Sequence, residues 1–60
     1  MDYYINWLQD EVKGFGSLHV ESAEDAEQSF NRMVKNLRER ELHGRLCILH
    51  GDTVIRDERV

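Results

Sequence analysis

The segment "SAEDAEQSFNRMVKNLRERELHG", residues 22–44, decides the fold because it has the pattern of one long amphipathic helix. Ser22 followed by Asp25 resembles a capping box, and Gly44 is a typical stop signal after a helix. The predicted helix covers about residues 22–41. At ~100° per residue, one stripe of its surface is apolar and consists of Ala23, Ala26, Phe30, Met33, Val34 and Leu37. This stripe predicts a helix that packs against a sheet on one side only.

The segment after the helix, "RLCILHGDTVIRDE" (residues 45–58), predicts a β-hairpin. Two β-rich runs surround Gly51-Asp52, which is a typical two-residue turn. That turn would oppose Leu49 to Val54 and Ile48 to Ile55. Alternation then places Leu46, Ile48 and Ile55 on one face, and Cys47, Leu49 and Val54 on the other. Both faces are apolar, and the helix can cover only one of them.

The N-terminal segment "DYYINWLQDEVKG" (residues 2–14) is compatible with two structures. As a strand it has apolar residues at alternate positions, and a second strand would follow over about residues 13–21; the alternating residues are Tyr3, Ile5 and Trp7. As a helix it has a capping aspartate at its start and a glycine at its end. We favour the strand, which predicts an α+β fold of order ββαββ with a four-stranded antiparallel sheet and one helix on one face. The alternative is αβαββ.

Composition indicates one small domain, residues 1–60, with a formal net charge of −4. Residues 1–30 carry seven acidic side chains and one basic, whereas residues 31–60 carry five acidic and seven basic. The lone Cys47 excludes an internal disulfide and suits a reducing compartment. The longest apolar runs fall far short of the ~20 residues of a membrane span. We therefore expect a cytoplasmic protein that is not inserted in a membrane.

The stretch "KGFGSLHV", residues 13–20, resembles the RNP1 octamer of the RNA recognition motif. Lys13, Gly14, Phe15, Gly16 and Leu18 fit that octamer, and the resemblance extends through the helix and the following strand to about residue 50. "YYINWL", which contains Tyr4, is loosely similar to RNP2. The resemblance implies single-stranded nucleic-acid binding on a sheet face; the site residues would be Tyr4, Lys13 and Phe15.

Catalytic or metal-binding residues do not stand out in this sequence. Cys47 and His50 are separated by an odd number of positions on one predicted strand, so they should point to opposite faces. His19 and His43 have no paired ligand motif. We therefore predict a protein that is not an enzyme and has no metal or cofactor.

The leading functional hypothesis is a small protein-interaction or regulatory module that forms a homodimer. A domain of this size has a marginal core, so association of exposed apolar faces would contribute to stability. The interface candidates are Tyr3, Tyr4, Trp7, Phe15, Leu46, Ile48 and Ile55. A variant is an inhibitor of a basic nucleic-acid-handling protein, in which acidic side chains imitate phosphates; these are Asp2, Asp10, Glu11, Glu21, Glu24, Asp25 and Glu27. The alternative function is a reduced nucleic-acid-binding sheet, which ranks second because the sequence pI is about 5.2.

Overall fold

A computed structural model describes residues 2–11 and 14–60, and the side chains of all of these except residues 14 and 15. In this part of the chain, four strands and one helix follow in the order β1 (Tyr3–Gln9), β2 (Gly14–Val20), α1 (Ala23–Glu39), β3 (Gly44–His50) and β4 (Thr53–Arg59). The strands form one antiparallel sheet in the order β2-β1-β3-β4. The predicted ββαββ fold is therefore confirmed.

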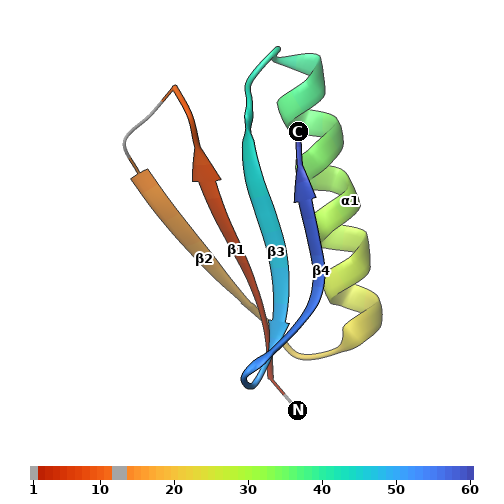
Figure 1. Cartoon of the computed structure of the whole chain (residues 1–60). Helices are drawn as coiled ribbons and strands as arrows, with labels where there is room; N and C mark the ends of the chain where they lie inside the picture. Colours follow the sequence, from red (N-terminus) through yellow and green to blue (C-terminus); the bar gives the residue numbers. More distant parts are fainter. Residues whose placement is uncertain (1, 12–13) are drawn as a thin grey trace.

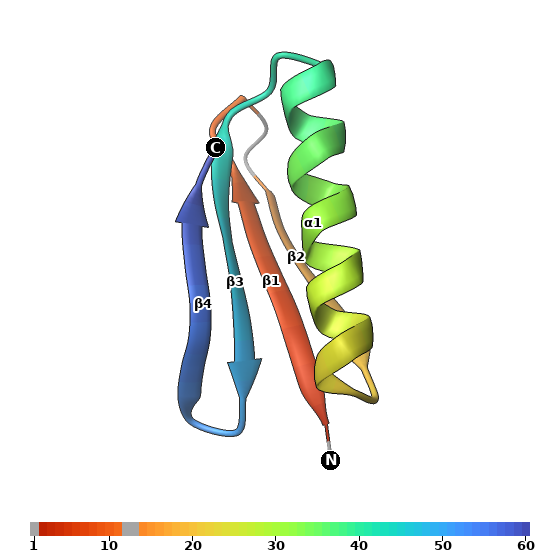
Figure 2. The same cartoon turned by 90° about the vertical axis from the view of Figure 1, so that its right-hand side faces the viewer.

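The molecule has two layers, because α1 lies along one side of the sheet in both views (Figures 1 and 2). We call the side of the sheet that α1 covers the helix face and the opposite side the open face. β1 and β3 are the central strands, and β2 and β4 form the two edges (Figure 1). No helix in the described part of the chain combines the length and the apolar character needed to cross a membrane.

β1 resolves the ambiguity of the N-terminal segment in favour of a strand. It pairs with β2 on one side and with β3 on the other, and Ile5 lies between Leu18 and Ile48. Ile5 is completely buried on the helix face, where Tyr3 and Trp7 pack against the same core. The alternation of residue types in β1 thus matches the alternation of the pleat, and the αβαββ alternative is wrong.

The helix begins as predicted, because the hydroxyl of Ser22 accepts a hydrogen bond of 3.1 Å from the backbone N–H of Asp25. This bond satisfies one of the free N–H groups of the first turn. Five of the six residues of the predicted stripe face the sheet. Met33 is partly buried, and the other four are buried, namely Ala26, Phe30, Val34 and Leu37. The sixth, Ala23, is exposed because it is the first helical residue and lies at the end of the contact with the sheet.

The helix ends at Glu39, earlier than predicted, and Gly44 is not the residue that terminates it. Glu41 has a left-handed backbone with φ of 56°. The N–H of Leu42 donates to the carbonyl of Leu37 at 2.9 Å, and the N–H of Glu41 donates to a carbonyl of the last turn at 3.1 Å. These two bonds form a Schellman motif, in which the left-handed position usually holds glycine. Gly44 instead begins β3, where a side chain would overlap the carbonyl oxygen of Leu8.

The second hairpin has the predicted turn but a different register beyond it. His50 pairs with Thr53 across Gly51-Asp52, whose glycine has a φ of 62°. The register then shifts by one residue, so that Ile48 pairs with Arg56 instead of Ile55. The shift is a β-bulge, in which one strand contributes an extra residue. The predicted Ile48–Ile55 pair is therefore wrong, and Ile55, which is 49% exposed, does not join the buried core.

Candidate functional site

An apolar row crosses the open face close to the β3–β4 turn. Tyr4, Leu49 and Val54 are opposed in register across β1, β3 and β4. Tyr4 is 42% exposed and Val54 is 55% exposed, whereas Leu49 between them is half-buried. The ring of His19 on β2 extends the row, with its centroid 5.2 Å from that of Tyr4. Apolar side chains on three adjacent strands thus remain in contact with solvent.

The rest of the open face is more polar. Ser17 donates a hydrogen bond of 2.7 Å to Oδ1 of Asn6, and Cys47 is opposed to Asn6 in the register of β3. Leu8, on the same side of β1, is 52% exposed. Asn6, Leu8, Cys47 and Arg45 contribute to the lining of a shallow depression of about 210 Å³. This end of the face offers apolar surface and hydrogen-bonding groups side by side.

The two arginines of the open face are already paired with carboxylates. Nε of Arg45 donates to Oδ1 of Asp57 at 2.8 Å, and a second nitrogen of the same guanidinium contacts the other oxygen. This bidentate hydrogen bond holds the pKa of Asp57 below its ordinary value of 3.8. Arg59 pairs with Asp10 at 2.5 Å. Because both charges are compensated, the positive potential available here to a phosphate group is reduced.

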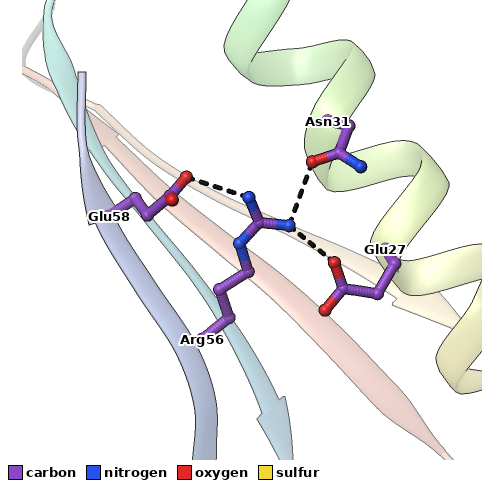
Figure 3. Close-up of polar contacts among 4 residues, drawn as sticks. All are labelled: Glu27, Asn31, Arg56 and Glu58. Carbon is purple, nitrogen blue, oxygen red and sulfur yellow. Dashed lines mark hydrogen bonds and ion pairs between the residues drawn. The ribbon is translucent and has the colours of Figure 1, made fainter.

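Arg56 connects β4 to the helix on the helix face (Figure 3). Its guanidinium lies 4.3 Å above the centroid of the Phe30 ring and donates hydrogen bonds to Glu27, Asn31 and Glu58. Desolvation opposes the charge on Arg56, whereas the hydrogen bonds to Glu27 and Glu58 favour it, and the pKa of the guanidinium is raised. Arg56 is thus a structural anchor whose hydrogen-bonding capacity is used within the chain.

The structure separates the aromatic residues that were predicted as interface anchors. Tyr4 lies on the open face, but Tyr3 and Trp7 lie half-buried on the helix face. The ring of Tyr3 stacks on that of His50, with centroids 4.3 Å apart. The backbone of Phe15 pairs with Leu8, while its side chain lies outside the described part of the structure. Lys13 also lies outside the described residues.

The aliphatic interface candidates differ in their exposure to solvent. Leu46 and Ile48 are buried beneath α1, with 0% and 1% exposure, so neither is accessible to a partner in this fold. Ile55, at the bulge of β4, is exposed. Sequence reasoning assigned these three residues to one face because it did not foresee the register shift.

The acidic residues predicted to imitate phosphates are divided between the two ends of the sheet. Asp10 and Glu11 follow β1, at the end opposite the N-terminus of α1 (Figure 1). Both oxygens of Glu11 accept from the backbone N–H of His43, at 3.0 and 3.1 Å, and this bond lowers the pKa of Glu11. A hydrogen bond with His19 similarly lowers the pKa of Asp2. Near the helix N-terminus, the remaining acidic positions are Glu21, Glu24, Asp25 and Glu27.

The side chains that could suggest metal binding do not converge. Cys47 belongs to the open face, whereas His50 stacks on Tyr3 on the helix face. Within residues 2–11 and 14–60, no three side chains of histidine, cysteine, aspartate or glutamate are placed to hold one metal ion.

Three exposed residues that matter for the surface were not among the interface candidates, although alternation in the second hairpin had already placed Val54 on one of its two apolar faces. Leu8 and Val54 belong to the open face, and Leu18 lies at the edge formed by β2. The alternation of β1 was a usable signal for Leu8, because it places Leu8 on the same side as Tyr4. Leu18 could be recognised only once β2 was known to be an edge strand.

The chain matches no known protein family, no curated protein and no solved structure. Its class is therefore given by its own architecture, a ββαββ domain with one uncovered sheet face.

Proposed function

We propose that this chain is a small, non-enzymatic protein-interaction module that acts as a homodimer. The observation that most strongly supports an interaction module is the uncovered side of the sheet, where Tyr4, Leu8 and Val54 are each more than two-fifths exposed. Contiguous apolar surface on a soluble domain often marks an interaction site. We also propose that the protein acts in the cytosol, because a single free thiol suits a reducing compartment.

The size of the core supports association. Its buried members are Ile5, Ala26, Phe30, Val34, Leu37, Leu46 and Ile48. Cores of domains below ~70–80 residues rarely supply more than ~3–5 kcal/mol of stability without additional constraints. Binding of a second copy to the folded state would add stability by mass action.

Subunit exchange tests the proposal directly. Two populations of the protein would carry a donor or an acceptor fluorophore on a C-terminal peptide tag, and would then be mixed. We expect energy transfer that rises with total concentration and disappears when excess unlabelled protein is added. Absence of transfer at a concentration of about 100 μM, where even weak homodimers are populated, would contradict self-association.

Nucleic-acid binding remains the second candidate because one arrangement favours it. Tyr4 and His19 place their rings next to each other on the open face, and the register places the backbone of Phe15 next to Leu8. Aromatic rings on a sheet surface can stack on unpaired bases. The paired state of Arg45 and Arg59 weighs against it.

Fluorescence anisotropy with a labelled single-stranded RNA would separate the two candidates. An RNA-binding sheet should show salt-dependent binding that Phe15→Ala and Tyr4→Ala weaken. The interaction module should show no anisotropy change at low salt with the wild type or with either substituted protein.

The inhibitor form of the proposal requires binding to a basic protein instead of RNA. Substitution of Glu21, Glu24 and Asp25 by neutral residues should abolish that binding.

A further inference from the structure

The two edges of the sheet differ in their suitability for pairing. β4 is interrupted by the bulge and has four consecutive charged residues, Arg56 to Arg59. Bulges and charged side chains are features by which edge strands avoid pairing with other chains. β2 instead pairs with β1 through seven successive residues without any register shift. Between Gly14 and Val20, its one titratable side chain is that of His19. β2 is therefore the edge that remains competent to pair.

On the helix face, the side chains next to this edge have a shape that is complementary to the same edge of a second copy. The indole of Trp7 extends over Gly16 of β2, where an added Cβ would overlap its ring atoms. Leu18 lies on the same side of β2, because it is opposed to the buried Ile5, yet it is 42% exposed. The edge thus presents an indole above a residue without a side chain, and two positions further along it presents an unburied leucine.

We propose that β2 pairs antiparallel with β2 of a second copy, across a twofold axis at Ser17. This proposal rests on the self-association proposed above and assigns its surface. Residues directly opposed in an antiparallel pair have side chains on the same face of the sheet, and a given residue lies on the same face in both copies. The twofold axis must therefore pass beside a residue that is opposed to its own copy, and not between two residues. A centre at Ser17 pairs all seven residues of the strand, from Gly14 to Val20. It also opposes Leu18 to the other copy's Gly16, where the leucine packs on the Trp7 indole of that copy.

The twofold axis has a consequence for the open faces. An axis perpendicular to the sheet places both copies of α1 on the same side of an eight-stranded sheet. The two open faces then join into one surface. Two copies of the row formed by Tyr4, Leu49 and Val54 lie on it, one on each side of the axis.

Two matched substitutions decide between this edge and a face-to-face dimer. Leu18→Lys adds a charge at the β2 edge, whereas Val54→Lys adds the same charge on the open face, at a position that is also more than two-fifths exposed. Both residues are exposed, so both variants should fold, which circular dichroism would verify. We expect Leu18→Lys to raise the dimer dissociation constant by about tenfold or more and Val54→Lys to leave it within about twofold. The opposite ranking would overturn the edge assignment, whereas a monomeric wild type would overturn self-association itself.

A crosslink tests the register. In a Cys47→Ser background, Ser17→Cys places one thiol of each copy at the twofold axis, where opposed Cα atoms are ~4.5–5.5 Å apart and within disulfide range. Thr53→Cys, on the other edge strand, is the control. With oxidised glutathione as the oxidant, we expect a covalent dimer with Ser17→Cys and little with Thr53→Cys. Equal crosslinking of the two variants, or preferential crosslinking through Thr53→Cys, would overturn the β2 register.

Discussion

Glu41 holds the C-terminus of α1 in a left-handed conformation that glycine adopts with less strain. Its φ is 56°, and the residue after it closes the Schellman motif by donating to Leu37. For an L-residue with a Cβ, this region costs roughly 1–2 kcal/mol relative to right-handed backbone. The helix therefore ends where its hydrogen bonds can be completed, at the expense of local strain.

Replacement of Glu41 by glycine should stabilise the fold. We expect Glu41→Gly to raise the free energy of unfolding by about 0.5–1 kcal/mol, because the relief of strain exceeds the added entropy of the unfolded chain. Urea unfolding at one fixed protein concentration would measure it. Arg32→Gly, at an exposed position inside the helix, is the control and should cost about 1 kcal/mol. A loss of stability with both variants would disprove the role given to Glu41.

Glu11 contributes stability that depends on pH. Its carboxylate accepts the backbone N–H of His43, and this bond lowers the pKa below its ordinary value of 4.5. A group with a depressed pKa in the folded state stabilises the fold above its unfolded pKa, and this contribution is lost as the pH falls through the folded pKa. The contribution of Glu11 should therefore be complete near neutral pH and decline in acid.

The variant Glu11→Gln should be less stable than the wild type at about pH 7, with the difference shrinking towards about pH 3. Urea midpoints at the two pH values would measure this. Asp52→Asn, in the exposed β3–β4 turn, removes the same charge and serves as the control. If Glu11→Gln had the same midpoint as the wild type at both pH values, the bond to His43 would make no net contribution.

At the scale of the elements, Phe30 is the largest fully buried side chain that α1 contributes to the core. It is completely buried, and the guanidinium of Arg56 covers one face of its ring. Phe30→Ala should reduce the free energy of unfolding by roughly 3–5 kcal/mol, because it removes apolar contacts and leaves a cavity. Gln28→Ala, on the exposed side of α1, should change it by less than about 0.5 kcal/mol. Equal urea midpoints for the two variants would refute the proposed packing.

Arg56 should determine how firmly β4 is held. The bulge and the exposed side chains of β4 leave this strand with little apolar contact to the helix. The contacts of Arg56 with Phe30, Glu27 and Asn31 connect β4 to the helix instead. Arg56→Gln should cost about 1 kcal/mol, and amide exchange should accelerate in Thr53–Arg59 more than in β1. Arg59→Gln is the control, and similar acceleration in both variants would contradict the anchoring role.

The elements with a clear periodicity were predictable from the sequence. The stripe through Phe30 and Val34 located the helix, and Gly51-Asp52 located the second hairpin, because both depend on local patterns. β1 was ambiguous, because Tyr3, Ile5 and Trp7 suit a strand while the whole segment also has helix end signals. Pairing of β1 with both β2 and β3 decided it, and pairing between distant segments is not visible in a local pattern.

The surface was harder to predict than the fold. The bulge moved Arg56 into the position expected for Ile55, and nothing local in "DTVIRDE" marks that shift. Interface candidates chosen by strand alternation in the hairpin then included Leu46 and Ile48, which the helix covers. Accessibility depends on which face and which edge remain uncovered, and this follows only from the assembled sheet.

At the scale of the whole molecule, a small core and the regular edge strand β2 favour self-association, and the apolar row of the open face is left for a further protein partner. Sedimentation equilibrium of the wild type at tens of micromolar, with thermal midpoints over a dilution series, tests this most directly. We predict a mass near twice the 7.1 kDa of one chain and a midpoint that rises with protein concentration. A stable species of 7.1 kDa, with a midpoint independent of dilution, would contradict the homodimer.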